Sequence, residues 1–475
     1  PGTGDVPLTV FQSIPIAGIV IVTTPQDLVE MVVKKAVNMA NMMDVPVLGL
    51  VENMSYLTCP DCGKKIEVFG HSKAEKIAAE YGIPAIARMP LEPKIAELVD
   101  AGRVEDVDSS PFKAIFAEIE KAKRFDSDEK IRITHKGKME KIRAFLQEIF
   151  KENEIAGMSV SITDEKETLG VFNFGVESVL TGNPIGNDSR FRIASITKIV
   201  TGLTVIRLVE QGKLDLEREI GRYIGWLPKE VAKLTLNSLL SHTAGLPREY
   251  TPNGPRDEQL LESSLQQELS QVSMEQVGNN RPYLYSNLGI RLVSLIVEKV
   301  TGERFSVASK RLVLQPLGMD QTFYSLKQAV TLPLSLPHEM KDGALLPVEM
   351  WENAVRLGAG GLFSTSSDLC KLARFILRFG KNDCGEQIIQ QEVIKKMLIP
   401  KTAIGAGDYY GLTMRLHAYR DRLLAGHMGS APPYCANLAI DSVSGYGVSL
   451  LINTAGKENL RDVITDSVLR LLSEN

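Results

Sequence analysis

The residues best suited to chemistry in this chain begin with a serine and a lysine three positions apart, Ser195 and Lys198. They open an apolar helical pattern, so they share one helix face, and the lysine amine is expected beside the serine hydroxyl. A serine hydroxyl is a poor nucleophile until a neighbouring base takes its proton. The spacing therefore predicts Ser195 as a covalent nucleophile and Lys198 as its base, at a helix N-terminus that favours an oxyanion.

The spacing alone is weak evidence, because Ser110 and Ser127 also have a lysine three positions later. A lone pair of this kind is more often an exposed helix pair than a nucleophile. Ser127 lies in a charged segment and Ser110 precedes a proline, so neither opens a buried helix. Only Ser195 has the context that the chemistry needs.

Two further segments carry polar side chains next to apolar elements. Tyr285-Ser286-Asn287 is the only Tyr-x-Asn sequence in the chain and precedes a second apolar helical pattern. His427-Met428-Gly429-Ser430 lies between a strand-like pair of leucines and a predicted strand over residues 447–452. Gly429 would let a substrate lie against a strand edge. Taken singly, Tyr285 would most often be a core residue and His427 a strand-end residue.

Together and in this order, the three segments resemble the motifs of the beta-lactamase-related serine hydrolases. That family includes class C beta-lactamases, D-alanyl-D-alanine peptidases, D-aminopeptidases and related esterases. The resemblance begins near Met139 and runs to the C-terminus. It extends to three further segments: Leu239-Leu240-Ser241-His242-Thr243-Ala244-Gly245-Leu246-Pro247, Pro316-Leu317-Gly318-Met319 and Gly358-Ala359-Gly360-Gly361-Leu362-Phe363-Ser364-Thr365.

The resemblance implies an antiparallel sheet flanked by helices, with a helical subdomain. It implies that Ser195 is acylated, that Lys198 keeps its hydroxyl primed and that Tyr285 relays the proton. Asn287 would hydrogen-bond the substrate amide, and the backbone N–H groups of Ser195 and Ser430 would form the oxyanion hole. The substrate class stays open between an ester, a beta-lactam and a D-amino-acid-type amide, and this chemistry uses no cofactor.

Two histidines of this region are interpreted differently. His427 stands where many family members have a lysine that meets the substrate carboxylate. Its pKa is expected near the usual value of about 6.5, so that carboxylate binding weakens as the pH rises. His242 is interpreted as structural, because the sequence indicates no acidic partner for a Ser-His-Asp triad.

The N-terminal region has a different pattern. Apolar runs at residues 19–22 and 47–51 flank a helical pattern over 26–43, which predicts a βαβ unit. Residues 1–122 resemble the C-terminal part of Mrp-type iron-sulfur scaffold ATPases, relatives of MinD. The matching segments are Pro1-Gly2-Thr3-Gly4-Asp5, Val51-Glu52-Asn53-Met54 and Cys59-Pro60-Asp61-Cys62-Gly63.

This second resemblance implies a truncated parallel α/β fragment of the P-loop type. Asn53 would be a vestigial adenine-facing residue, and Cys59 and Cys62 would hold a four-iron four-sulfur cluster between two subunits. None of the Gly-Lys pairs is followed by Ser or Thr, so no phosphate loop is present and ATP hydrolysis is not expected. We interpret the region as a remnant or as an incomplete gene model.

The composition of the chain limits which classes of partner are expected. The formal charge is -4, from 54 Lys+Arg and 58 Asp+Glu, so nucleic acid is not an expected partner. No window approaches the about 20 apolar residues of a membrane span. Five cysteines are an odd number at low density, which indicates a reducing, cytoplasmic location. The expected partners are a small-molecule or peptide substrate and a second subunit.

The predicted organisation is therefore residues 1–122, a charged linker over 123–138 and a hydrolase domain over 139–475. The main hypothesis is a serine hydrolase with an acyl-enzyme on Ser195. The alternative is an iron-sulfur scaffold or carrier protein whose hydrolase fold only binds ligands.

Overall fold

The computed structural model describes residues 18–42, 45–248, 254–255, 257–350 and 354–473. The chain forms two compact units, Pro1–Lys136 and Gly137–Asn475, which are considered separately below. The helix expected after the charged linker begins earlier, because α5 (Lys113–Glu152) continues through residues 123–138. Lysine, arginine and glutamate, which are frequent in this segment, are good helix formers. The division at 122 and 138 stays a prediction.

The first unit is a small parallel α/β structure. Strand β2 pairs in parallel with β1 and with β4, and β3 pairs with it antiparallel. Its elements are β1 (Ile19–Thr23), α2 (Asp27–Met42), β2 (Val47–Thr58), β3 (Lys65–Ile66), α3 (Ala74–Tyr81), β4 (Ile86–Pro90) and α4 (Pro93–Asp100). The predicted βαβ unit is confirmed. The segment from Pro1 to Asp5 lies outside the described residues.

The second unit is built on an antiparallel sheet of eight strands in the order β11-β12-β13-β14-β15-β16-β5-β6. The strands are β5 (Gly157–Thr163), β6 (Thr168–Gly175), β11 (Thr402–Gly405), β12 (Asp408–Tyr410), β13 (Arg415–Tyr419), β14 (Arg422–Ala431), β15 (Tyr434–Asp441) and β16 (Tyr446–Ile452). Short pairs form between β7 (Phe191–Arg192) and β10 (Phe363–Ser364) and between β8 (His338–Lys341) and β9 (Ala344–Pro347).

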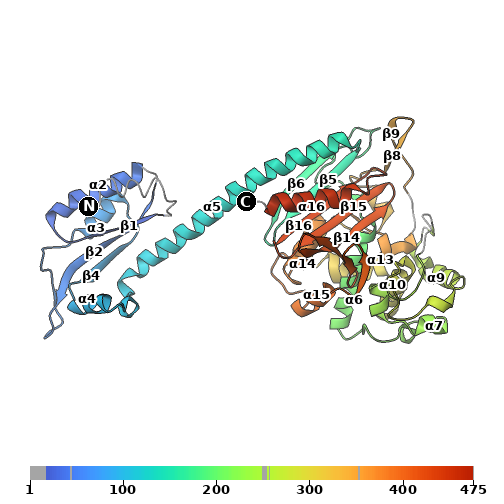
Figure 1. Cartoon of the computed structure of the whole chain (residues 1–475), viewed down its shortest axis with the longest axis horizontal. Helices are drawn as coiled ribbons and strands as arrows, with labels where there is room; N and C mark the ends of the chain where they lie inside the picture. Colours follow the sequence, from blue (N-terminus) through green and yellow to red (C-terminus); the bar gives the residue numbers. More distant parts are fainter. Residues whose placement is uncertain (1–17, 43–44, 249–253, 256, 351–353, 474–475) are drawn as a thin grey trace. The chain divides into compact units, whose positions relative to one another are not determined.

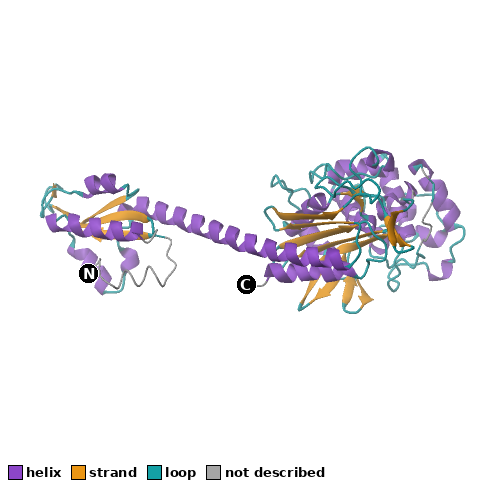
Figure 2. Ribbon diagram, turned by 90° about the horizontal axis from the view of Figure 1, so that it is seen from above, coloured by secondary structure: helices purple, strands orange, loops and turns teal. Residues whose placement is uncertain are grey.

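Helices cover both faces of the large sheet (Figure 2). On one face, Ile142 and Leu146 of α5 join side chains of α16 (Leu460–Ser473) in one buried apolar cluster with strand β5. On the other face, the hydroxyls of Ser159 and Ser161 contact Ser366 of α14 (Ser366–Leu377). Alternate residues of β5 therefore point to opposite helical layers, as the pleat of a strand requires.

The remaining helices form a subdomain with a large apolar core beside the sheet. They are α6 (Thr197–Glu210), α7 (Lys229–Ala232), α8 (Leu236–Leu240), α9 (Leu261–Leu269), α10 (Asn287–Thr301), α11 (Phe305–Ser309), α13 (Leu357–Gly360) and α15 (Gln391–Met397). Helix α12 (Leu326–Ala329) packs instead in a small separate cluster with Phe323 and Phe363. The expected fold class is confirmed. Within the described ranges, no helix is long and apolar enough to cross a bilayer.

Candidate active site

Ser195 lies on a tight turn that leads into a buried helix. It belongs to the 3-10 turn η3 (Ala194–Ile196), directly before α6. Ala194 has a φ of 47°, a left-handed conformation that costs free energy for a residue with a side chain. The Thr197 hydroxyl donates to the Ala194 carbonyl at 2.6 Å and accepts the Leu362 N–H at 3.3 Å. The expected helix start at Ser195 is confirmed, and the turn is held from both sides.

Lys198 projects from the first turn of α6 into a fully buried position. Its Nζ lies 3.2 Å from Ser195 Oγ, 2.9 Å from Asn287 Oδ1 and 2.6 Å from the Ala359 carbonyl oxygen. These acceptors come from η3, α10 and α13. Three acceptors match the three donors of an ammonium group, which is what burial of a lysine requires.

Tyr285 reaches Ser195 from the loop before α10. Its phenol donates a hydrogen bond to Ser195 Oγ at 2.7 Å. Burial raises the pKa of Tyr285 to about 12, and the bond to Ser195 opposes that shift. The side chain is therefore a phenol at neutral pH.

The loop that carries Tyr285 is fixed by its neighbour Ser286. The Ser286 hydroxyl accepts the Gly289 N–H at 3.0 Å, which caps α10, and donates to the Pro247 carbonyl at 2.9 Å. The Ser286 N–H donates to Nδ1 of His242 at 3.2 Å. Burial lowers the pKa of His242 well below its usual value, and no described carboxylate hydrogen-bonds to its ring. The structural interpretation of His242 agrees with these contacts.

The segment from His427 to Ser430 lies on strand β14 itself, and β15 follows it. From the sequence, this segment was expected between two strands, because only Leu423 and Leu424 before it look strand-like. Pairing between β13 and β14 ends at Gly426, and the following edge of β14 packs against η3. A Cβ on Gly429 would lie 2.3 Å from the Ile193 carbonyl oxygen. Close backbone contact therefore requires this glycine, whereas its role toward a substrate stays a prediction.

His427 is buried, and both of its ring nitrogens have partners. Nε2 lies 2.9 Å from the Tyr410 hydroxyl, and Nδ1 lies 2.6 Å from the Met428 carbonyl oxygen. A carbonyl only accepts, so Nδ1 carries the proton and the Tyr410 hydroxyl donates to Nε2. Burial and the nearby charge of Lys198 lower the pKa of His427 to about 3. The expected titration near pH 6.5 was wrong, because the sequence does not reveal burial of this side chain.

The other predicted residues lie around the same point. Asn287 opens α10 and presents its Oδ1 to Lys198. Ser430 is exposed on β14, the strand that packs against η3. The rings of Tyr285 and His427 have centroids 6.3 Å apart. The structure thus brings together the residues that the three motifs supplied, and their catalytic and binding roles stay predictions.

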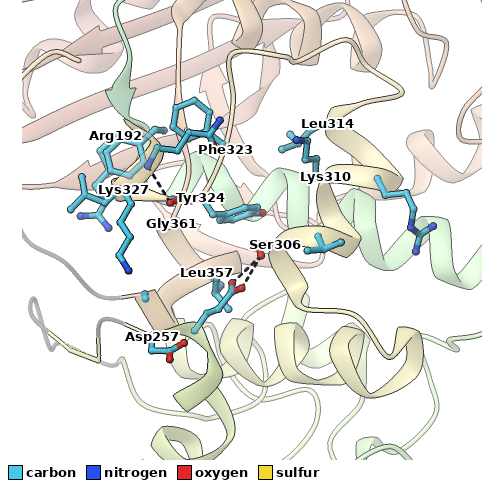
Figure 3. Close-up of a pocket in the computed structure, with 18 of the residues that line it drawn as sticks. Arg192, Asp257, Ser306, Lys310, Leu314, Phe323, Tyr324, Lys327, Leu357 and Gly361 are labelled. Carbon is cyan, nitrogen blue, oxygen red and sulfur yellow. Dashed lines mark hydrogen bonds between the residues drawn. The ribbon is translucent and has the colours of Figure 1, made fainter. Parts of the chain in front are cut away.

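A cavity of about 790 Å³ opens elsewhere in the second unit (Figure 3). The ring of Tyr324 lies across it, with Phe323 and Arg192 nearby. None of Ser195, Lys198 and Tyr285 lines this cavity, so it is not the candidate site.

In the first unit, Cys59 and Cys62 lie on one tight turn after β2. The Cys59 N–H donates to the Lys64 carbonyl, and the Gly63 N–H donates to the Cys59 carbonyl, both at 2.9 Å. Hydrogen bonds from the backbone of Cys62 and Asp61 lower the pKa of the Cys59 thiol. No set of three metal-binding side chains occurs in the described part of the chain. Two thiols on one turn fit half of a four-thiolate cluster site.

Asn53 lies in β2, close to the cysteine turn in sequence. Its side-chain oxygen accepts the Met54 N–H at 2.9 Å. This contact is local, so the nucleotide role of Asn53 stays a prediction.

The first unit resembles iron-sulfur proteins. Residues 1–123 match the family model for a NUBPL iron-transfer P-loop NTPase. The iron-sulfur cluster carrier protein of Pseudomonas fragi is 43 % identical over 121 residues, which are 25 % of this chain and 42 % of the relative. That of Pyrococcus abyssi is 48 % identical over 102 residues, 22 % of this chain and 35 % of the relative. The chain therefore spans less than half the length of these curated relatives.

The second unit resembles several solved structures in its fold. The octameric penicillin-binding protein homologue from Pyrococcus abyssi has a TM-score of 0.62 at 23 % identity, covering 70 % of this chain and 77 % of that one. A class C beta-lactamase has a TM-score of 0.62 at 18 % identity, covering 71 % and 97 %. The D-amino acid amidase from Ochrobactrum anthropi has a TM-score of 0.60 at 22 % identity, covering 71 % and 100 %. These likenesses show the fold. The beta-lactamase family model matches residues 142–472, most of the chain, and the chain therefore belongs to the beta-lactamase family.

Proposed function

We propose that this protein is a serine hydrolase that forms an acyl-enzyme on Ser195 and cleaves an ester or a D-amino-acid-type amide. One observation carries the proposal: Ser195 Oγ is within hydrogen-bond reach of both Lys198 Nζ, at 3.2 Å, and the Tyr285 hydroxyl, at 2.7 Å. A nucleophile in contact with two proton-transfer groups is the arrangement that acyl transfer needs.

Acylation requires that the serine proton leaves as Oγ attacks the substrate carbonyl. Lys198 and Tyr285 both donate to Oγ in the resting arrangement, so the reactive form is the one in which this pair has lost one proton. Both groups contact the same oxygen, Ser195 Oγ. The lysine amine then accepts the serine proton, and the Tyr285 phenol passes a proton to the leaving group.

The tetrahedral intermediate needs donors for its oxyanion. The Ser195 N–H lies in η3, directly before the N-terminus of α6, whose dipole favours negative charge. The packing of β14 against η3 supports Ser430 as the second donor. Deacylation repeats the sequence in reverse, with water as the nucleophile and the same pair as base.

Labelling with a fluorophosphonate probe and turnover of a neutral p-nitrophenyl ester test this proposal. Ser195→Ala should abolish both, and Lys198→Ala should lower turnover by about 10²- to 10⁴-fold, the usual contribution of general-base catalysis. Tyr285→Phe should also be severely impaired. Ser110→Ala is the matched control, because this exposed serine has the same spacing from a lysine. Undiminished labelling in Ser195→Ala would mean that another residue is the nucleophile.

For the first unit we propose a second function, the binding of an iron-sulfur cluster between two chains. The shared turn of Cys59 and Cys62 and the similarity to carrier proteins support it. Each chain would supply two thiolates, and the cluster would supply the redox or transfer chemistry. Anaerobic reconstitution with iron and sulfide should give cluster absorbance and a dimer, and the Cys59→Ser and Cys62→Ser variants should lose both. A monomer with full cluster content would contradict the shared site.

A further inference from the structure

His417 lies between two carboxylates that belong to different elements of the second unit. It is on β13, and its Nδ1 lies 3.1 Å from Asp408 Oδ1 of the neighbouring strand β12. Its Nε2 lies 3.1 Å from Asp466 Oδ2 of helix α16. An ionised carboxylate only accepts hydrogen bonds, so both contacts are hydrogen bonds only when both ring nitrogens carry a proton. The charged ring therefore connects the sheet to the helix.

Arg415 completes this cluster and contacts the same two elements. Its guanidinium donates two hydrogen bonds to Asp462 of α16, at 2.9 and 3.0 Å, and reaches Asp408 Oδ2 at 2.6 Å. Its Nη2 also lies 2.9 Å from Nδ1 of His417. Nη2 carries two hydrogens, and the two carboxylates can accept both of them. Every hydrogen of Nη2 is therefore bonded when His417 donates to Asp408.

The loss of one proton from His417 breaks this arrangement. If Nδ1 loses the proton, it must accept a hydrogen from Arg415 Nη2, in competition with the two carboxylates. If Nε2 loses the proton, its lone pair faces Asp466 Oδ2 with no hydrogen between them. The other oxygen of Asp466, Oδ1, is buried and has no hydrogen-bond partner in the described part of the chain. Each neutral form of the ring therefore has one hydrogen bond fewer than the charged form.

The surrounding charges favour the proton on balance. The hydrogen bond to Asp466 raises the pKa of His417, and the charge of Asp462 acts in the same direction. Burial and the charge of Arg415 oppose this shift. Tyr419, also on β13, donates to the backbone carbonyl of Asp466 at 3.3 Å. A raised histidine pKa stabilises the folded state below about pH 6.5, and this contribution is lost as the pH rises through the folded-state pKa.

The cluster supports the strand that carries Tyr410. Strands β12 and β13 pair through Tyr409 with Leu416 and through Tyr410 with Arg415, which is a short ladder. The Tyr410 hydroxyl donates a hydrogen bond to His427 of the candidate active site. Because few backbone hydrogen bonds hold β12, its side-chain contacts strongly affect how often it opens.

We propose that His417 is a pH-sensitive switch, which connects β12 and β13 to α16 while both ring nitrogens are protonated and loses this connection when one proton leaves. His417 lies outside every motif of the sequence, and the switch does not depend on the proposed hydrolase function. Its release should make the edge of the sheet from β11 to β13 open more often at alkaline pH.

Hydrogen exchange of the full chain, followed by mass spectrometry, tests the switch over residues 402–419. The exchange rates are corrected for the effect of pH on free amides, so that only the protection of the segment is compared between pH 6 and 9. We expect this protection to fall in the parent by up to about tenfold for each unit by which the folded-state pKa of His417 exceeds that of the unfolded chain.

His417→Gln should remove this pH dependence, because glutamine keeps polar contacts and binds no proton. Its protection at pH 6 should be close to that of the parent at pH 9. His71→Gln is the matched control, since this exposed histidine of the first unit also contacts a carboxylate, Glu67 Oε2 at 2.7 Å. An equal pH dependence in the parent and in His417→Gln would overturn the proposal.

Nitrogen-15 labelling of the histidines gives a second measurement in the parent itself, with the signal of His417 assigned by its absence in His417→Gln. His417 should be doubly protonated at pH 6 and should lose its proton above pH 6.5. Asp466→Asn should lower the pH of this transition, because it removes the carboxylate at Nε2. A ring that loses its proton below pH 6.5 in the parent would also overturn the proposal.

Discussion

His427 should stay neutral throughout the pH range in which the protein would be assayed. With a pKa of about 3, about one imidazole in a hundred is protonated at pH 5, whereas an exposed histidine with a pKa of about 6.5 would be protonated in about 97 of a hundred molecules. The groups that face it are Tyr410, Tyr285, His242, Met428, Lys198, Arg415 and Arg461. None of these supplies a negative charge that would restore the proton.

The measurable quantity is the ratio of kcat/KM for two thioester substrates, one with a free carboxylate in its leaving group and the other its methyl ester. Both substrates use Lys198 and Tyr285, so an effect of pH on these two groups changes both values of kcat/KM alike and cancels in the ratio. We expect this ratio to change by less than about twofold between pH 5 and 8, because His427 stays neutral over this range. His427→Gln is the control, since glutamine can accept from Tyr410 and cannot titrate. A ratio that falls tenfold with a midpoint near pH 6.5 in the parent alone would refute the reasoning.

The same shift has a consequence for stability. The folded state holds His427 neutral, and the unfolded chain protonates it below about pH 6.5. Its contribution to stability is therefore present above pH 6.5 and is lost as the pH falls toward 3. Between pH 6.5 and 5 the loss is at most about 2 kcal/mol, from 1.36 kcal/mol per pH unit. Urea unfolding at pH 7 and 5 should show a smaller acid effect in His427→Gln, whereas an unchanged effect would argue against a buried neutral imidazole.

Two further predictions concern the framework of the site. Gly429→Ala should lower the unfolding free energy by about 1 to 3 kcal/mol, as overpacking does. It should also slow ester turnover, because the added Cβ would press on the Ile193 carbonyl. An unchanged turnover rate and melting temperature would contradict this contact. A fragment that starts at Gly137 should hydrolyse the ester without residues 1–136. A shorter fragment that also lacks the rest of α5 should be less stable by several kcal/mol, because about 2 to 5 kcal/mol is lost for each of the buried side chains Ile142 and Leu146. Thermal unfolding measures the difference, and equal stability of the two fragments would refute this prediction.

The sequence predicted the residues that meet at Ser195 because their evidence is local. The spacing of Ser195 and Lys198 on one helix is a property of a single turn, and Tyr285 directly precedes a helix start. Each motif lies next to a predicted helix or strand, and the order of the three motifs along the chain indicated the family. The fold class followed from that resemblance and from strand and helix periodicity.

The electrostatics of the site depend on contacts that no single segment contains. His427 owes its neutrality to burial and to Tyr410, which lies outside every motif. Arg248 directly follows the His242 segment, but only the tertiary structure places it over Tyr285. Strand β15 was missed because its run from Tyr434 to Asp441 mixes cysteine, alanine and asparagine with few large apolar residues. The charge of His427, the position of Arg248 and the strand β15 depend on burial and on long-range pairing. Neither of these produces a periodic pattern in the sequence.

Lys198 shows why the scaffold and the chemistry are inseparable here. Its partners Asn287 and Ala359 lie 89 and 161 residues away along the chain, on α10 and α13. A buried ammonium is tolerated only when every donor is satisfied, so the packing of these two helices against α6 determines where the amine sits. The burial that holds Lys198 also raises the pKa of Tyr285 and lowers that of His427. One enclosed environment therefore keeps Tyr285 a phenol and His427 a neutral imidazole beside Ser195.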